Sequence, residues 1–283
     1  MAMNKAPYYI ALTALAVLLP VAALAHQPRL VTGPTVTVLE PEVSKAYYGV
    51  LEGQPAVFSF QAPAEFDLYV GLLVPDIAGA RTDLSATINR DGQVLVALDG
   101  GASTWKKFHE EFAGDDYLQG PEFRARGQAG SYEIAVSAPG DRGKYVLAVG
   151  EKESFTPAET LNALRVIPEL KTGFFGQPTA AGFVTSVFGA VSLALALAAG
   201  ALLALISRRL IRLFKKKSAV PIRRNLGRPD RLYRLVIAVI SLAAGLILWS
   251  PILQLVAGYV LFEAVAGWCV VYAAMGRNTC PIG

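Results

Sequence analysis

The two cysteines of the chain, Cys269 and Cys280, lie eleven residues apart near the C-terminus. A thiolate is a nucleophile, a metal ligand and a redox group. In an unbroken helix the two sulfurs would lie about 16 Å apart, whereas a disulfide needs Cα atoms within about 7 Å. Gly276 is a residue at which the helix can end, so that the tail folds back toward Cys269. The alternatives are a reduced pair, a redox-sensitive pair, a persulfide carrier, a metal thiolate site, or small buried residues that close the helix end.

A carboxylic acid occupies the last apolar run of the chain, at Glu263. A charge at the centre of a bilayer costs at least ~2.5 kcal/mol, so we expect Glu263 to be neutral or to face another helix. Tyr259 precedes it by one helical turn and is a candidate hydrogen-bond donor. An acid within a membrane suggests proton or ion handling, although three spans are few for a transporter.

The chain has two histidines, His26 and His109. If an export signal is removed after Ala25, His26 begins the mature chain and offers an amine and an imidazole nitrogen. Together with His109 it would form a copper site, because imidazole suits copper. The alternative is a frayed N-terminal histidine and a second one in a solvated loop.

A long insertion between Gly100 and Gly127 combines aromatic and acidic residues. Its candidate ligand-binding residues are Trp105, Phe108, Asp115, Asp116 and Tyr117. Aromatic faces beside carboxylates could hold a sugar, a peptide or Ca²⁺. The alternative is that the aromatic side chains pin the insertion onto the domain while the acids face water.

Other catalytic signatures are missing from the sequence. It has no G-x-S-x-G, H-E-x-x-H, phosphate-binding loop or dinucleotide fingerprint, and two histidines exclude most hydrolase triads and zinc sites. We therefore expect no cofactor and favour a non-enzymatic protein.

The elements that would carry these residues begin with an export signal. Lys5 precedes an apolar run that ends in Ala23-Leu24-Ala25, which predicts a signal peptide at residues 1–25. The alternative is an uncleaved anchor helix. Either way, we expect the domain that follows to lie outside the cytoplasm.

Residues 26–150 predict an all-β domain. Eight short segments rich in β-branched and aromatic residues alternate with turn signals, which indicates an antiparallel, jelly-roll-like sandwich. Two strand patterns, Phe66–Val70 and Gly130–Gly150, resemble those of bacterial pre-peptidase C-terminal-type β-sandwiches. That resemblance implies a small extracytoplasmic binding or accessory module without catalytic residues.

A connector and a membrane span follow. Thr156-Pro157-Ala158-Glu159 predicts the start of an amphipathic helix within residues 151–182. Residues 183–206 carry no charge and are long enough to span a bilayer. Small residues recur every fourth position along this span, at Ser192, Ala196, Gly200 and Ala204. Such a face predicts close packing on the C-terminal hairpin or, as a homo-oligomer, on a second copy.

The positive charge of the chain is concentrated in a basic loop at residues 207–231. Eleven lysines and arginines lie between residues 208 and 234 beside one acid, Asp230, whereas residues 29–171 hold 20 acids and 13 basic residues. The cluster predicts a cytoplasmic location by the positive-inside rule and contact with anionic lipid. The net charge of +4 therefore does not indicate nucleic-acid binding.

Residues 225–283 predict an apolar hairpin, with one helix from Arg234 to Trp249 and another from Ile252 to Met275. The pattern Asn225-x-Gly227-x-x-Asp230-Arg231-x-x-Arg234 precedes it, and Gly267-Trp268-Cys269-x-x-Tyr272 and Gly276-x-Asn278-Thr279-Cys280-Pro281 end it. These patterns resemble the YgaP-like transmembrane domain family, although Val270 stands where that family usually has proline. The resemblance implies a thiol role for Cys269 and Cys280. It does not imply sulfur transfer, because nothing in the chain resembles a rhodanese active loop. The whole chain is thus expected to be a multi-pass inner-membrane protein with three mature spans and a cytoplasmic C-terminus.

Overall fold

A computed structural model describes residues 26–214 and 224–280 of the chain. The chain divides into two compact units, the first ending at Pro178 and the second beginning at Thr179. The predicted signal peptide and the middle of the basic loop lie outside the described residues.

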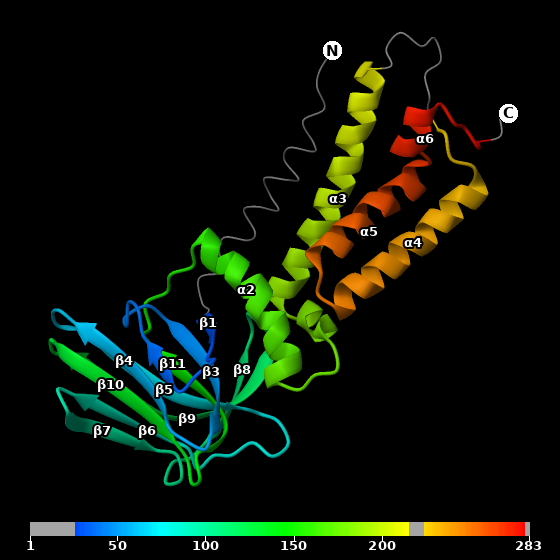
Figure 1. The fold of residues 1–283 in the computed structure, drawn as a ribbon. Coiled ribbons are helices and arrows are strands. Elements are labelled where there is room, and N and C mark those ends of the chain that lie inside the picture. Colours follow the sequence, from blue (N-terminus) through cyan, green and yellow to red (C-terminus); the bar gives the residue numbers. More distant parts are fainter. Residues whose placement is uncertain (1–25, 215–223, 281–283) are drawn as a thin grey trace. The chain divides into compact units, whose positions relative to one another are not determined.

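The described part of the first unit contains eleven strands (Figure 1). In chain order they are β1 Gln27–Leu30, β2 Thr35–Thr37, β3 Lys45–Glu52, β4 Ala56–Ala62, β5 Phe66–Pro75, β6 Ser85–Arg90, β7 Gln93–Asp99, β8 Lys106–Glu110, β9 Asp115–Gly127, β10 Gly130–Ser137 and β11 Arg142–Val149.

These strands form two sheets that pack as a sandwich. Sheet A has the order β1-β3-β11-β5-β9-β8 and sheet B the order β2-β4-β10-β6-β7. The pairs β1–β3 and β2–β4 are parallel, and the remaining pairs are antiparallel. The sandwich is therefore mixed rather than purely antiparallel, because β1 and β2 add to corresponding edges of the two sheets without an intervening hairpin.

The core between the sheets is built from the inward-facing residues of both. Strand β10 shows the alternation that the sequence predicts, since Tyr132, Ile134 and Val136 are at most 1% exposed. The Tyr132 ring stacks on Phe60 with 5.0 Å between the centroids. Burial of such rings is a large part of what holds a sandwich without disulfides together.

The insertion predicted between Gly100 and Gly127 is itself part of sheet A. It forms the antiparallel hairpin β8–β9, in which Phe108 is opposite Tyr117 and His109 is opposite Asp116. The interpretation of this segment as an insertion between strands was therefore wrong. The tip of the hairpin is also buried, since Phe112 is 6% exposed and its ring lies 5.3 Å from that of Phe155.

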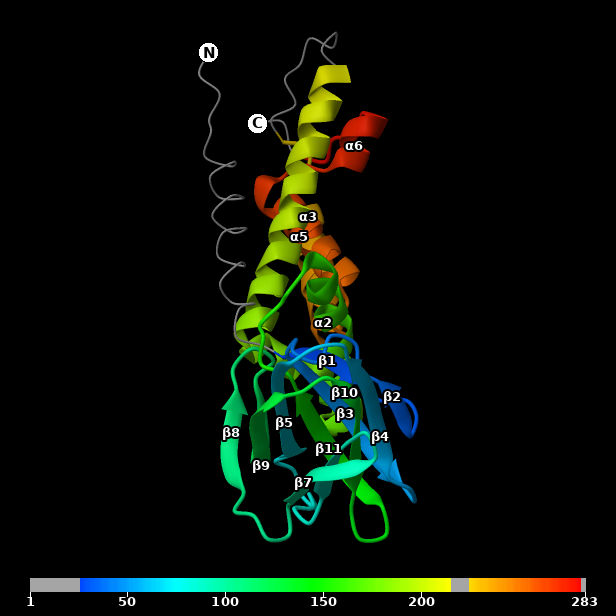
Figure 2. The same cartoon turned by 90° about the vertical axis from the view of Figure 1, so that its left-hand side faces the viewer.

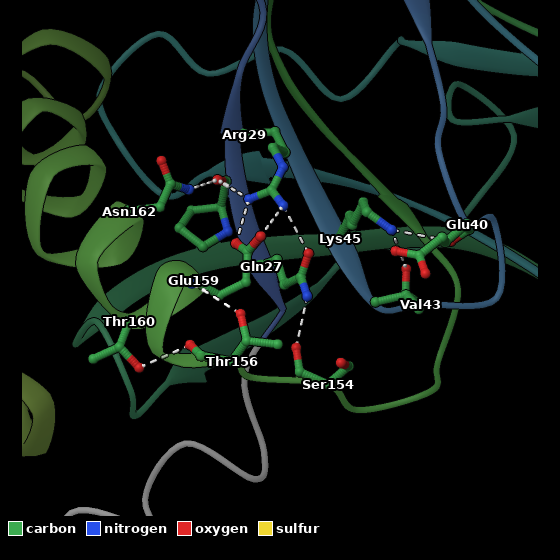
Figure 3. A network of polar contacts seen from close by, with 11 residues as sticks. Gln27, Arg29, Glu40, Val43, Lys45, Ser154, Thr156, Glu159, Thr160 and Asn162 are labelled. Atoms are coloured by element: carbon green, nitrogen blue, oxygen red, sulfur yellow. Dashed lines mark hydrogen bonds and ion pairs between the residues drawn. The ribbon is translucent and has the colours of Figure 1, made fainter.

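Helix α2, Pro157–Glu169, and the π-helical turn η2, Leu170–Phe174, cover the outer face of sheet A. The Thr156 hydroxyl accepts the Glu159 N–H at 3.3 Å, which confirms the predicted cap. The Glu159 carboxylate does not complete a capping box. It instead receives both terminal nitrogens of Arg29 at 2.8 and 2.9 Å (Figure 3). This pair ties the start of α2 to the edge strand β1.

The second unit consists of helices. They are the 3₁₀ turn η3 Ala180–Thr185, α3 Val187–Phe214, α4 Arg228–Ile247, α5 Pro251–Ala266 and α6 Val270–Met275. Helix α5 packs against both α3 and α4 (Figures 1 and 2). Among the described residues, α3 is the one helix that is long and apolar enough to cross a bilayer by length and composition.

The second helix of the predicted hairpin is not continuous. It breaks at Gly267, which has a φ of 64°, and resumes at Val270. Helix α5 alone has 16 residues and is about 24 Å long, which is shorter than a bilayer core of about 30 Å.

The small-residue face of α3 packs on α5 of the same chain. A Cβ at Gly200 would collide with the Leu255 carbonyl oxygen, and one at Gly258 would collide with the Leu197 carbonyl oxygen. The backbones of α3 and α5 therefore approach closely at these two glycines. The sequence predicted that this face packs either on the C-terminal hairpin or on a second copy of the chain. At Gly200 it packs on the hairpin.

Candidate functional site

The break between α5 and α6 is held by the side chain of Asn225, which lies just before the start of α4. The Asn225 Nδ2 group donates to the Cys269 carbonyl oxygen at 2.9 Å, and the Cys269 N–H donates to Asn225 Oδ1 at 2.7 Å. Both residues are fully buried. A helix break leaves backbone groups without partners, and Asn225 satisfies two of them.

The Cys269 thiol lies beside an ion pair. Arg234 contacts the Cys269 Sγ through Nη2 at 3.0 Å and donates through Nη1 to Glu263 Oε2 at 2.6 Å. Glu263 is 2% exposed, and its other oxygen accepts the Val270 N–H at 2.9 Å. Glu263 thus faces α4, which is one of the two outcomes expected from the sequence, and Tyr259 lies half-buried one turn earlier on α5. A guanidinium stabilises a thiolate, but Cys269 has no exposed surface through which a substrate could reach it.

The C-terminal tail folds back onto the start of α4. Gly276 ends α6 with a φ of 67°, which confirms the predicted helix end. The Thr279 N–H then donates to the Asn225 carbonyl at 3.2 Å, and the Thr279 hydroxyl bonds Asp230. This leaves Cys280 partly exposed, whereas Cys269 is enclosed, and both thiols are free.

The predicted ligand-binding residues of the β-sandwich do not converge on one surface. Asp115 is 3% exposed, and its carboxylate receives the equally buried ammonium of Lys171 at 2.6 Å. Burial raises the pKa of Asp115, and Lys171 opposes that rise. Tyr117 is also buried, with its hydroxyl 2.9 Å from that of Tyr48. Trp105 packs at the edge of the core and donates to the Gly100 carbonyl at 2.9 Å.

Phe108 and Asp116 are the members of this set that remain accessible. Phe108 is 40% exposed, and Asp116 is exposed beside His109, with 2.7 Å between Asp116 Oδ1 and His109 Nδ1. They belong to different faces of the β8–β9 hairpin, because residues 108 and 109 point to opposite sides of a strand.

The two histidines have separate partners. His26 Nδ1 is hydrogen-bonded to the Ser44 hydroxyl beside β1, and burial lowers the pKa of His26. His109 lies on β8, and β1 and β8 are the opposite edges of sheet A. The structure thus does not bring the predicted copper ligands together.

A cavity that the sequence did not indicate lies in the β-sandwich unit. Its volume is about 400 Å³, and it is lined by the β1–β2 connection, the end of β3, the β3–β4 turn and the segment around η2. Tyr48, Leu51 and Phe174 contribute apolar surface, and Glu52 and Glu169 contribute carboxylates. Its walls come from four separate segments, so no local motif marks it.

The polar cluster around Asn225 and Cys269 lies within the part of the chain that matches a known family. Residues 222–283 match the family described as Inner membrane protein YgaP-like, transmembrane domain. This YgaP-like domain supports a membrane location for the chain, in agreement with the apolar helix α3.

Solved structures similar to the chain match only part of its length. One is the pre-peptidase C-terminal domain of collagenase from Bacillus anthracis, with 10% identity, a TM-score of 0.25, and coverage of 44% of this chain and 95% of that chain. Another is a β-glucosidase from Kluyveromyces marxianus, with 14% identity, a TM-score of 0.22, and coverage of 39% and 12%. Comparison with curated proteins gives no match.

The motif residues of the YgaP-like domain prove to be contacts within it. The pattern that leads into the first turns of α4 and the pattern that follows α5 meet, since Asn225 binds Cys269 and Asp230 binds Thr279. The sequence marks these residues but gives no sign of which pairs form. The role of Arg234 as the neighbour of the Cys269 thiol is visible only in the structure.

Proposed function

We propose that the chain is a multi-pass inner-membrane protein that presents its β-sandwich on the extracytoplasmic side as a binding or sensing module. The apolar helix α3 and the YgaP-like domain support the membrane location. The basic residues that follow α3 and precede α4 favour a cytoplasmic loop. The apolar segment at residues 1–25 favours export of the domain after it.

Three spans are consistent with the helices of the second unit. Helix α3 would lead inward, α4 outward, and α5 followed by α6 would return, which leaves the C-terminus in the cytoplasm. The polar break at Gly267 would then lie near the cytoplasmic surface, beside the basic residues at the start of α4, where backbone groups and charges are better tolerated than at the bilayer centre.

The observation that carries the binding role is the cavity of about 400 Å³ in the β-sandwich unit. This volume falls in the range of small-molecule sites, which are typically about 300–1,000 Å³ and combine apolar walls with a few polar groups. The side-chain charges that line the cavity are those of Glu52 and Glu169. Two carboxylates beside an apolar wall favour a small organic amine with an apolar body.

The test uses residues 26–178, which contain a hydrophobic core of their own. After thermal unfolding has shown that this fragment is folded, binding of 1-aminohexane is measured by ligand-observed NMR, with hexan-1-ol as the uncharged match. The amine should bind more tightly than the alcohol. The double variant Glu52→Gln with Glu169→Gln should weaken binding of the amine. Glu133→Gln, on the exposed face of β10, should leave amine binding unchanged. Equal signals from amine and alcohol would reject a carboxylate-lined site. Loss of binding in Phe108→Ala would move the site to the β8–β9 hairpin.

A second candidate function is redox or sulfur handling through Cys269 and Cys280. It is favoured by the contact of Arg234 with the Cys269 sulfur and by the partial exposure of Cys280. Alkylation and mass spectrometry of intact membranes would test it. Cys280 should react with iodoacetamide and Cys269 should not. If neither thiol changes under peroxide or polysulfide, the chain does no thiol chemistry.

A further inference from the structure

A groove on the YgaP-like domain combines two arginines with apolar side chains. Its volume is about 290 Å³, and it lies between the start of α4 and the end of α5. It is lined by Arg228, Arg231, Leu232, Leu235, Ala264 and Val265. The arginines occupy the first turns of α4, and the leucines follow them along the helix, so the groove is cationic at one end and apolar at the other.

The position of one guanidinium is fixed by the end of the neighbouring helix. Arg231 donates through Nε to the Ala264 carbonyl at 2.7 Å and through Nη2 to the Val265 carbonyl at 3.2 Å. These carbonyls lie in the last turn of α5, where helices have unpaired acceptors. Arg231 has five N–H donors, and these two bonds leave further donors for a ligand.

No acid neutralises this end of the groove within residues 26–214 and 224–280. The ion pairs there include neither Arg228 nor Arg231. The acid nearest in sequence, Asp230, is bonded to the Thr279 hydroxyl. Two unneutralised guanidinium groups attract an anion, and a guanidinium matches phosphate geometry well.

The other end of the groove suits an acyl chain. Leu232 is 63% exposed, Leu235 43% and Val265 68%. The apolar surface continues along α4 through Val236, Val239 and Ile240, which are also exposed. A water-soluble anion such as free phosphate would leave all this surface uncovered, whereas a phospholipid covers it with its chains.

We propose that this groove is a binding site for one anionic phospholipid, with its phosphate between Arg228 and Arg231 and an acyl chain along Leu232, Leu235 and Val265. A zwitterionic phospholipid fits less well, because its ammonium or choline group would lie beside two positive charges. The site lies on residues that the YgaP-like match includes.

The test is native mass spectrometry of the full chain, released from detergent after addition of palmitoyl-oleoyl phosphatidylglycerol or the matched phosphatidylcholine. The wild-type chain should retain one phosphatidylglycerol and less phosphatidylcholine at equal concentration. Arg228→Gln should reduce retention of phosphatidylglycerol about five-fold, the effect of one surface charge on lipid binding. Arg209→Gln, which removes the same charge from the exposed end of α3, should reduce it clearly less, because Arg209 attracts anionic lipid only as part of the basic cluster and does not line the groove.

Val265→Asn tests the apolar half and should also reduce retention. The melting temperature of each variant in detergent shows that it is folded. Equal retention of the two lipids, or equal losses in Arg228→Gln and Arg209→Gln, would overturn the site in favour of diffuse attraction. Displacement of the lipid by glycerol 3-phosphate would assign the site to a soluble phosphate. A lipid-free dimer would assign the groove to a second copy of the chain.

Discussion

At the residue scale, one of the two acids predicted to bind a ligand forms part of the protein interior. Asp115 and Lys171 are 56 positions apart and meet in a buried ion pair, where Lys171 also donates to the Gly114 carbonyl at 3.0 Å. The pair joins the tip of the β8–β9 hairpin to η2. A pattern of neighbouring acids and aromatics could not reveal this, because the partner of Asp115 lies in a different element.

Removing one member of this pair should be costly. Asp115→Asn leaves the Lys171 ammonium buried without its counter-charge, so we expect the free energy of unfolding of residues 26–178 to fall by about 3–5 kcal/mol. Urea unfolding followed by circular dichroism measures it. The double variant Asp115→Leu with Lys171→Met should recover most of the loss, because it leaves no buried charge. Asp116→Asn is the exposed control, and an equal loss there would contradict the assignment.

The hairpin tip also predicts a dependence of stability on pH. Burial raises the pKa of Glu110 above its ordinary value of 4.5, against the opposing hydrogen bonds from the Ala113 and Phe112 N–H groups. The folded state therefore holds this proton more tightly than the unfolded state. The free energy of unfolding should then fall as pH rises above 4.5 toward the raised pKa, since the unfolded state loses its proton first.

Glu110→Gln should flatten this pH dependence in residues 26–178. Glu111→Gln is its matched control, because Glu111 is the exposed neighbour in the chain and the slope should persist there. Urea unfolding at a series of pH values compares the two. A slope that is the same in both variants would assign the pH dependence to other groups.

At the element scale, the sequence predicts those helices and strands whose ends and faces are determined by residues a few positions apart. Strand β10, the Thr156 cap and the helix end at Gly276 were predicted, because alternation, capping residues and glycine act within a few residues. Strand β1 and the β8–β9 hairpin were missed, since their strands are polar or short and form by pairing with distant partners. The break after α5 was missed because Gly267 lies in an apolar run and its stabilising partner, Asn225, is 42 positions earlier.

This break supplies a test of how Cys269 is kept buried. Asn225→Ala removes the donor to the Cys269 carbonyl and the acceptor for the Cys269 N–H, which should cost about 1–3 kcal/mol for each group left unsatisfied. The segment around Cys269 should then open, and iodoacetamide should label Cys269 in the folded protein. Asn278→Ala, which loses only the bond to the Cys280 N–H, should leave Cys269 protected. Protection in both variants would show that other contacts keep the thiol buried.

The packing of α3 on α5 depends on glycine. Gly200→Val places side-chain atoms where the Leu255 carbonyl lies, so the helices must separate, at a cost of about 1–3 kcal/mol for overpacking. We expect a lower melting temperature of the full chain in detergent. Ala199→Val adds two methyl groups at the adjacent exposed position and should change little. If both variants melt alike, α3 and α5 do not pack in this way in the membrane protein.

At the scale of the whole molecule, the charged residues are distributed unequally between the two compact units. Residues 29–171 carry 20 acids and 13 basic residues, whereas residues 208–234 carry eleven basic residues and one acid. The acidic part is the β-sandwich unit with its own core, and the basic part lies at the ends of α3 and α4. Basic residues beside spans are retained in the cytoplasm, so this asymmetry predicts that the two parts face opposite compartments.

Accessibility of single cysteines tests that orientation on intact cells. The native Cys280 lies in the C-terminal tail and is partly exposed, so a membrane-impermeant maleimide should label it only after permeabilisation. In a Cys280→Ser background, Gln93→Cys places a thiol at an exposed position at the start of β7, and it should be labelled without permeabilisation. Buried Cys269 should stay unlabelled in both cases, because its sulfur has no exposed surface. The reverse pattern would place the β-sandwich in the cytoplasm, and the cavity could then meet only cytoplasmic ligands.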